Sequence, residues 1–550
     1  MSDSAQPAPA PLPGPVRWIK ENFEAVVVAF IMALVIRCFS LEVFKIPTAS
    51  MEPTLLGDAR DRSRGGDRIM VNKFAYEVRD VQRYDILVFK FPLDLSRNFI
   101  KRCVGLPDEE LAFRGGDIYT RKKATDPFVL ARKPLPVQEN VWIPVYTGGC
   151  DAAAFRERWK EASKEKDNWE LYQGALRTFA SPGKSPETRF AFVPEDLVVY
   201  DVDRDRPGIR DNPHPVSDLR IGARVEFLPA PGDALAPRGE FDLTLRHDEG
   251  TPHERVFRVV LRPGAPVRVE HPAPDGTPAL AELPHTVRLQ TPVDVALLVY
   301  DGAMTVLLDG RPVHDAVWRT APPPADAGLV AARLSFGTRH ADTVIRNVSV
   351  ARDLYYFVMN DDDPFPPDRP VRIPPDCHLL VGDNIRNSHD GRAWQRVEVE
   401  FIDGTSVFWD RNLFLGEPRG DDLARSAPDC ALFLKKSDTN PHVNEVGWAV
   451  PHRLIRSIRK PRPRHQFTLA GGGVVVWDSD LVRPLPNGAF ALHERDRATG
   501  GLGALRRTLA AGEVAGYGPV APVTWVERKH IVGKAFAIWW PPGRWFRLIR

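Results

Sequence analysis

One serine and one lysine offer the clearest route to chemistry in this 550-residue chain. Ser50 lies in the stretch KIPTASMEPTLLGD, a few residues after the only strongly apolar run of the sequence. A serine nucleophile needs a base, and a lysine amine can act as one once burial has lowered its pKa from the usual value of about 10.4. Lys101, in NFIKRCVGL, has strand neighbours that can supply such a dry setting. From spacing alone, a lysine on the solvated face of a strand is the commoner case.

Other arrangements that would carry chemistry are absent from the sequence. It contains no Gly-x-Ser-x-Gly, no His-Glu-x-x-His and no Cys-x-x-Cys, and its 14 histidines show no triad spacing. A Ser-x-x-Lys occurs at 163–166, but in a highly charged segment where a chance match is expected. The five cysteines are scattered, so we expect neither a disulfide framework nor a zinc site; they are Cys38, Cys103, Cys150, Cys377 and Cys430.

The apolar run AVVVAFIMALVI at 25–36 is shorter than the roughly 20 residues that a transmembrane helix needs. Extending the count to 23–44 gives sufficient length, so we predict a transmembrane anchor there. A buried core helix or the apolar part of a signal peptide is the alternative. Arg17 and Lys20 precede the run, which predicts a cytoplasmic N-terminus. The first 22 residues are predicted to form a disordered cytoplasmic tail.

Composition and pattern both favour a mainly β fold. The chain has 52 prolines and 40 glycines, and its apolar residues alternate over short segments bounded by turns. The formal net charge of +2 gives no reason to expect nucleic acid as a partner. Strand segments follow one another regularly over 214–357, with hairpin signals at Asp301-Gly302 and Asp309-Gly310, which predicts a β-sandwich. This stretch resembles a concanavalin-like or laminin-G-like jelly roll.

The sandwich is one of two predicted insertions into a β-rich core. Before it, Trp142, Trp159 and Trp169 bracket the polar stretch AAAFRERWKEASKEKD, which we interpret as a surface helix. The predicted segments are a tail at 1–22, an anchor at 23–44, the first part of the core at 45–121, a mixed insertion at 122–213, the sandwich at 214–357, the second part of the core at 358–394, a second insertion at 395–515 and a C-terminal core segment at 516–550.

Five segments in a fixed order resemble the conserved boxes of type I signal peptidase, the bacterial leader peptidase family. They are IPTASMEPTL, GDRIMVNKFAY, RYDILVFKFP, FIKRCVGLP and VGDNIRNSHDGRAW, and VGKAFAIWWP provides a closing match. Together they cover about 23–119 and 373–394, while the insertions lie outside the resemblance. The resemblance implies a membrane-bound serine endopeptidase that removes signal peptides from exported preproteins with a Ser-Lys dyad. Such a dyad needs neither a metal nor a cofactor.

The resemblance also implies roles for individual residues. The serine of the first box falls on Ser50, the implied nucleophile, and the lysine of FIKRCVGLP falls on Lys101, the implied general base. Thr48 matches the hydroxyl that joins the Ser50 N–H in the oxyanion hole. Ser388 matches the hydroxyl that orients the lysine amine. The residues that match structural positions near the site are Asp383, Asp390, Arg392 and Arg102.

Four departures from the family pattern affect the surroundings of the dyad. Ile385-Arg386 stands where the family has Arg-Asp, and Gly391 stands where it has serine. Asp108 follows the GLP of the fourth box where a glycine is usual, and Tyr84 replaces a glycine in RYDILVF. These changes leave the dyad in place but bring the local loop geometry into question.

The implied location is the bacterial inner membrane, as a single-pass protein with its catalytic part on the extracytoplasmic side. The implied partners are exported preproteins, the lipid bilayer and the secretion translocon. One alternative function is a catalytically inactive, membrane-tethered binding protein that recognises glycan or protein through its sandwich. Another is a soluble, self-cleaving Ser-Lys regulator, which the apolar anchor disfavours.

Overall fold

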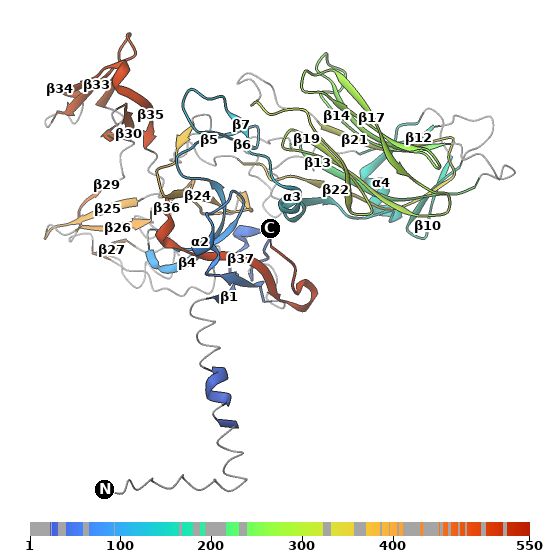
Figure 1. The fold of residues 1–550 in the computed structure, drawn as a ribbon, viewed down its shortest axis with the longest axis horizontal. Coiled ribbons are helices and arrows are strands. Elements are labelled where there is room, and N and C mark those ends of the chain that lie inside the picture. Colours follow the sequence, from blue (N-terminus) through green and yellow to red (C-terminus); the bar gives the residue numbers. More distant parts are fainter. Residues whose placement is uncertain are drawn as a thin grey trace, which may run out of the picture.

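Strands dominate the computed structural model, in agreement with the predicted fold class (Figure 1). The structure describes residues 22–23, 25–30, 40–58, 65–92, 94–163, 168–179, 187–192, 216–229, 239–322, 332–356, 370–385, 388–394, 396–403, 406–410, 430–432, 450–451, 455–459, 464–470, 474–478, 481–496, 502–520 and 525–549. The predicted tail at 1–22 lies outside them except for its last residue. The named helices and 3-10 turns are α2 (Ala75–Val78), α3 (Leu135–Val141), α4 (Ala152–Arg158), η1 (Ala49–Met51), η6 (Ala511–Glu513), η7 (Arg528–His530) and η8 (Pro542–Arg544).

The predicted anchor at 23–44 needs a correction at its C-terminal end. Residues 22–23 and 25–30 are helical, and the apolar side chains of Phe23 and Phe30 are exposed. Strand β1 (Leu41–Lys45) then begins inside the predicted span and pairs with β2 (Arg68–Asn72). Exposed and half-buried side chains alternate along LEVFK, and this period suits the edge of a sheet rather than a helix. Within the described residues, no helix has the length and apolar character needed to cross a membrane.

The sheet that carries the candidate site is assembled from distant parts of the chain. Its seven strands run in the order β1-β2-β37-β3-β4-β24-β36. The bounds not yet given are β3 (Ile86–Phe91), β4 (Asp94–Gly105), β24 (Cys377–Val381), β36 (Val526–Glu527) and β37 (Ile531–Trp540). Strand β37, near the C-terminus, thus inserts between β2 and β3 (Figure 1). Nearly every side chain of β3 is buried, which explains its almost unbroken apolar run ILVFKF.

A small sheet continues the core toward the sandwich. Its order is β23-β5-β6-β7, formed by Val371–Arg372, Glu110–Arg114, Asp117–Arg121 and Val129–Leu130. Strand β7 pairs with β6, so the core reaches Leu130, and the boundary predicted at 121 falls too early.

The insertion is a sandwich of two antiparallel sheets (Figure 1). One runs β10-β11-β22-β13-β18-β19-β20, with β8 also paired to β22. Its strands are β8 (Ile143–Tyr146), β10 (Trp169–Tyr172), β11 (Ala175–Thr178), β13 (Leu219–Phe227), β18 (Val293–Tyr300), β19 (Ala303–Leu308), β20 (Arg311–Val317) and β22 (Thr343–Arg352). The other runs β17-β16-β15-β14-β21-β12-β9. Its strands are β9 (Trp159–Glu161), β12 (Glu187–Phe192), β14 (Glu240–His247), β15 (Arg255–Leu261), β16 (Pro266–Pro272), β17 (Pro278–Thr286) and β21 (Ala332–Arg339). Apolar side chains from both sheets form one core.

The two Asp-Gly hairpins are confirmed, because β18–β19 and β19–β20 are joined at these turns and all four residues have positive φ. Two other predictions for this region were wrong. The stretch 122–213 is not separate from the sandwich, since β8 to β12 complete both sheets. The predicted surface helix is only the seven residues of α4, and Phe155 and Trp159 are fully buried. Charged residues surround these two aromatic residues in the sequence, so the local composition wrongly suggested an exposed helix.

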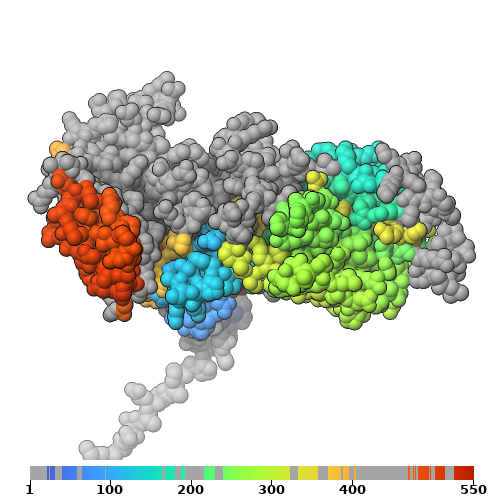
Figure 2. Space-filling view, turned by 90° about the horizontal axis from the view of Figure 1, so that it is seen from above, coloured from blue at the N-terminus to red at the C-terminus, as the bar shows by residue number. Residues whose placement is uncertain are grey.

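The second insertion forms small sheets. The first group is β25 (Arg396–Phe401), β26 (Ser406–Asp410), β27 (Cys430–Leu432), β28 (Val450–Pro451) and β29 (Ile455–Arg459). The second is β30 (Arg464–Leu469), β31 (Val474–Asp478), β32 (Val482–Pro484), β33 (Phe490–Arg495), β34 (Leu502–Leu509) and β35 (Val514–Val520). Because β35 pairs with β30, this insertion extends to 520 and not to 515 as predicted. The second group lies across the core from the sandwich (Figures 1 and 2).

Candidate active site

Ser50 lies in the short turn η1, between strand β1 and the core. Its neighbour Met51 and the nearby Leu55 are fully buried and pack in the apolar cluster beneath the central sheet. The turn is closed against Gly57, where a Cβ would come within 2.3 Å of the Thr48 carbonyl carbon. Only glycine permits this approach, so the packing of the turn fixes the position of the serine.

Lys101 reaches Ser50 from strand β4. The distance from Lys101 Nζ to Ser50 Oγ is 2.7 Å, and both residues are buried. The Thr48 hydroxyl donates to Ser50 Oγ over 3.3 Å. The structure therefore brings together three residues for which the sequence predicted catalytic roles, and the separation of Lys101 Nζ and Ser50 Oγ suits proton transfer.

The surroundings of Lys101 favour the neutral amine. The pKa of Lys101 is lowered from 10.5 to about 8, with burial as the main cause; Asp390 and Asp383 oppose this shift, and Arg392 adds to it. At pH 7 a lysine with a pKa of about 8 is roughly 10% neutral, against about 0.03% for an ordinary lysine. Burial is the largest of these causes, so the site depends on excluding water.

Two buried arginine–carboxylate pairs flank the lysine. Arg102 Nε and Nη2 each donate to Asp383 over 2.7 Å. Arg392 Nε and Nη2 donate to Asp390 over 2.9 and 2.8 Å. Burial alone would raise the pKa of Asp390, but Arg392 and the N–H of Gly382 hold it below its usual value. Each arginine thus offsets a carboxylate that would otherwise favour the lysine ammonium.

Ser388 lies in the same crowded region, and its hydroxyl oxygen has no hydrogen-bond partner within the described residues. The structure consequently contains no Lys101–Ser388 hydrogen bond. A Cβ on Gly382 would come within 2.1 Å of Ser388 Oγ and 2.4 Å of the Ser50 carbonyl oxygen. The loop after β24 therefore crosses the serine turn closely, with glycine at the crossing point.

Sequence reasoning missed two residues that join these segments. The N–H of Asn384 donates to the Ser50 carbonyl, and its side-chain amide donates to the Ala49 carbonyl, each over 3.1 Å. The Thr54 hydroxyl donates to Asp383 over 2.5 Å. Both are polar residues inside the boxes quoted above, and this position could have marked them as candidate site residues.

The structure describes four of the five residues at which the chain departs from the family pattern. Tyr84 and Asp108 have φ values of 74° and 61°, so each occupies the left-handed backbone that a glycine would adopt more easily. At Gly391 a Cβ would come within 2.9 Å of both Leu379 Cδ1 and the Leu380 carbonyl oxygen, which suits glycine. Ile385 is buried, and its carbonyl accepts a hydrogen bond from Arg392 over 2.9 Å.

The remaining departure, Arg386, lies outside the described residues.

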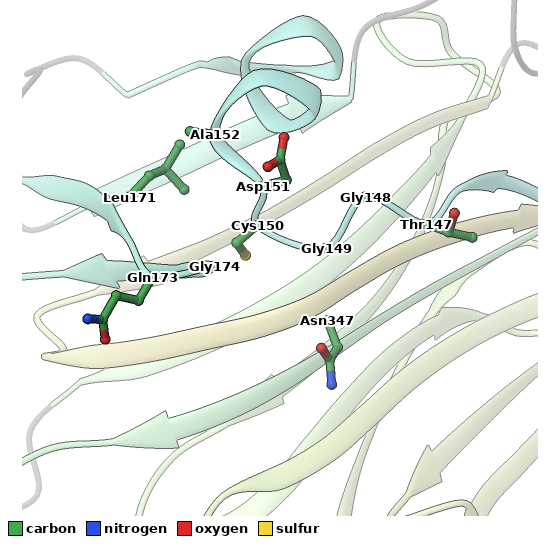
Figure 3. Close-up of a pocket in the computed structure, with 10 residues that line it drawn as sticks. All are labelled: Thr147, Gly148, Gly149, Cys150, Asp151, Ala152, Leu171, Gln173, Gly174 and Asn347. Atoms are coloured by element: carbon green, nitrogen blue, oxygen red, sulfur yellow. The ribbon is translucent and has the colours of Figure 1, made fainter.

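A hollow lies in the sandwich, beside the start of α4 and the turn between β10 and β11 (Figure 3). It has a volume of about 500 Å³ and is lined mainly by small and polar residues, among them Thr147, Gln173 and Asn347. Asn347 occurs where β22 has one more residue than β13 opposite it, and its φ is 54°. Such a bulge redirects a side chain.

Three carboxylates gather where the sandwich meets the core. Side-chain oxygens of Asp117, Asp218 and Asp301 lie within 4.8 Å of one another. Arg319 donates to Asp117 over 2.8 Å, and Lys133 lies 2.6 Å from Asp301. Burial and Asp218 raise the pKa of Asp117 to about 8. Arg319 and Lys133 already pair with these carboxylates, so we interpret the cluster as buried ion pairs between sandwich and core and not as a metal site.

The N-terminal part of the chain is similar in sequence to a known protein family. Residues 17–169 match the sequence profile of the family described as signal peptidase, peptidase S26. The resemblance to type I signal peptidases is thereby confirmed for this part of the chain.

Individual relatives agree with the peptidase S26 assignment. The probable signal peptidase I-1 of Synechocystis sp. is 37% identical over 117 residues, which is 20% of this chain and 56% of that protein. Signal peptidase I of Pseudomonas fluorescens is 38% identical over 124 residues, 19% of this chain and 41% of that protein. The chain thus spans about half the length of these curated relatives.

Among solved structures, the carbohydrate-binding module CBM66 from Bacillus subtilis covers 35% of this chain and 94% of its own. Its sequence identity is 12% and its TM-score is 0.23, a likeness too low to support an argument.

The peptidase S26 segment contains Thr48, Ser50 and Lys101. The loop after β24, which carries Asp383 and Ser388, lies outside the matched segment. Pairing of β24 with β4 brings that loop to the dyad.

Proposed function

We propose that this protein is a membrane-bound serine endopeptidase that removes signal peptides from exported preproteins. The observation that carries the proposal is the 2.7 Å separation of Lys101 Nζ and Ser50 Oγ in a buried setting that lowers the lysine pKa to about 8. The peptidase S26 match and the signal peptidase relatives support the same reaction class.

In the proposed reaction, the neutral Lys101 amine accepts the Ser50 proton while Ser50 Oγ attacks the scissile carbonyl carbon. The resulting oxyanion receives hydrogen bonds from the Thr48 hydroxyl and the Ser50 N–H. When the C–N bond breaks, the Lys101 ammonium gives its proton to the leaving amine, and Ser50 remains acylated by the signal peptide. Lys101 then removes a proton from the water that hydrolyses this ester.

Ser388 is proposed to orient the Lys101 amine, since its hydroxyl is buried in the same crowded region, beside Gly382 and Asp390. Asp383, Asp390, Arg102 and Arg392 are proposed to hold the surrounding loops, because each buried charge is neutralised by one opposite charge. The chemistry needs no metal or cofactor.

Bilayer attachment and extracytoplasmic location are part of the same proposal. Exposed apolar side chains occur on β1, on β37 and in the segment after β37. Strands β1 and β37 belong to one sheet, and only β2 lies between them. Trp539, Trp545 and Phe546 contact one another there and are 39%, 50% and 60% exposed. Aromatic side chains of this kind suit a membrane interface, close to the preprotein and the translocon.

The test is cleavage of a preprotein bearing an Ala-x-Ala site by the detergent-solubilised full chain. We expect cleavage by the wild type and none by Ser50→Ala or Lys101→Ala, each with an unchanged circular dichroism spectrum. Wild-type cleavage rates in either folded variant would overturn the proposal.

The hollow in the sandwich favours a second candidate function, ligand binding by a catalytically inactive protein. Its polar lining, which includes Gln173, Asn347 and the carboxylate of Asp151, suits hydroxylated ligands such as glycans. Binding of the full-length protein to a glycan array, combined with failure to acylate Ser50 by a mechanism-based probe, would favour this function. Residues 214–357 alone are unsuitable for this test, because they lack strands β8 to β12.

A further inference from the structure

Tyr84 connects the core to the segment that leads into the sandwich. Its φ of 74° is unfavourable for a side chain of this size, yet the residue is only 3% exposed. Its hydroxyl donates to the carbonyl of Ala131, which lies just after β7. The buried ring and this hydrogen bond thus hold Tyr84 in a conformation that glycine would adopt freely.

The backbone of Tyr84 lies next to the Arg102–Asp383 ion pair. Its carbonyl accepts a hydrogen bond from Arg102 Nη1 over 2.9 Å, and the same arginine holds both oxygens of Asp383. Lys101 adjoins Arg102 in β4, and Asp383 is one of the charges that act on it. One residue therefore contacts both the segment leading to the sandwich and the ion pair beside the base.

Two further parts of the insertion approach the same ion pair. The Thr54 hydroxyl, bonded to Asp383, also lies 3.4 Å from the Asn140 carbonyl of α3. Helix α3 occupies the junction between core and sandwich (Figure 1). Tyr356, after the last sandwich strand, is buried with a hydroxyl that has no hydrogen-bond partner among the described residues. Charges from both sides, Lys133 and Asp383, act on it.

The junction itself is held by buried charges. Lys133 Nζ lies 2.6 Å from Asp301 and 3.0 Å from Asp353, and all three residues are at most 3% exposed. Separating the sandwich from the segment that carries Lys133 would break both of these buried ion pairs at once. The sandwich is therefore docked firmly and is not a freely hinged appendage.

We propose that the docked sandwich is a positioning element of the Ser50–Lys101 site, and that Tyr84 ties it to the Arg102–Asp383 pair. This inference rests on the peptidase function proposed above. The sandwich covers the ion pair and keeps water from it, and so preserves the dry setting on which the neutral amine depends. The groups that face Lys101 are Ser50, Asp383, Asp390, Arg392 and the ring of Phe99.

Tyr84→Gly tests the proposal, because glycine accepts the φ of 74° and keeps the carbonyl that binds Arg102, while the ring is lost. Tyr146→Ala is the matched control. Tyr146 is a buried tyrosine of the sandwich core whose hydroxyl also donates to a backbone carbonyl, that of Gly149, over 2.8 Å. Its ring packs against Trp159 and Phe192 within the sandwich.

The readout is the pH midpoint of Lys101, measured by competitive labelling with 1-fluoro-2,4-dinitrobenzene and mass spectrometry. Water admitted beside the ion pair raises the midpoint, so we expect an increase of about one pH unit in Tyr84→Gly and none in Tyr146→Ala. Cleavage at pH 7 should fall about tenfold in parallel, because the neutral fraction falls tenfold per unit. An unchanged midpoint in Tyr84→Gly, or an equal shift in the control, overturns the proposal.

Labelling does not require cleavage, so the two proposals can fail separately. If the wild type cleaves no preprotein while Tyr84→Gly still shifts the Lys101 midpoint, only the peptidase function is refuted. Should Tyr84→Gly not fold, Tyr84→Phe removes the hydroxyl bond to Ala131 alone. A smaller shift in the same direction then supports the coupling, and an unshifted midpoint refutes it.

Discussion

The rate of signal-peptide cleavage should depend on pH in a way that reports the lowered pKa of Lys101. With a Lys101 pKa of about 8, the neutral fraction is half at pH 8 and roughly 1% at pH 6. The cleavage rate should therefore rise about 50-fold between these values and level off near pH 9. A solvated lysine would instead continue to gain neutral amine up to about pH 10.5.

The assay is cleavage of an Ala-x-Ala preprotein at substrate concentrations well below KM, from pH 6 to pH 10, in detergent. Ser50→Ala and Lys101→Ala provide the background rates at each pH. Circular dichroism at the two extremes shows whether unfolding contributes to any loss. A rate that is flat between pH 6 and 8, or that still rises tenfold between pH 9 and 10, would refute the buried-base explanation.

Three further predictions concern individual side chains. Since Lys101 has a lower pKa in the folded protein than in the unfolded chain, its burial costs stability below pH 8, and the cost disappears as the pH approaches 10.5. Lys101→Met should therefore raise the free energy of unfolding by about 3 kcal/mol at pH 7 and by much less at pH 10, as measured by urea denaturation. Thr48→Val should lower kcat by roughly 10²- to 10³-fold with little change in KM, as measured by steady-state kinetics; an unaffected kcat would exclude Thr48 from the oxyanion hole. Gly382→Ala should reduce both activity and thermal stability, by about 1–3 kcal/mol for the latter, because the new methyl group displaces Ser388 or the Ser50 carbonyl. A fully active, equally stable variant would show that the crossing can relax.

The local sequence pattern predicted structure correctly where a few neighbouring residues are enough to determine it. Alternation predicted a mainly β chain, and the two Asp-Gly pairs predicted their hairpins, because turn chemistry acts over four residues. The same local view failed at Trp159 and Phe155, whose charged neighbours suggested a surface helix although both side chains are buried. The local pattern also extended the predicted anchor to residue 44, inside strand β1, because apolar residues alone do not distinguish a transmembrane helix from an edge strand.

By itself the sequence determined which residue types stand in which order: a serine turn, a lysine strand and the later Gly-Asp-Asn loop. Their meeting was decided only by tertiary structure, because β24 pairs with β4 across an insertion of more than 200 residues and β37 enters between β2 and β3. The state of Lys101 depends on the same long-range packing. Burial and the charges of Asp383, Asp390 and Arg392 set its pKa, and these three residues lie far from Lys101 in the sequence.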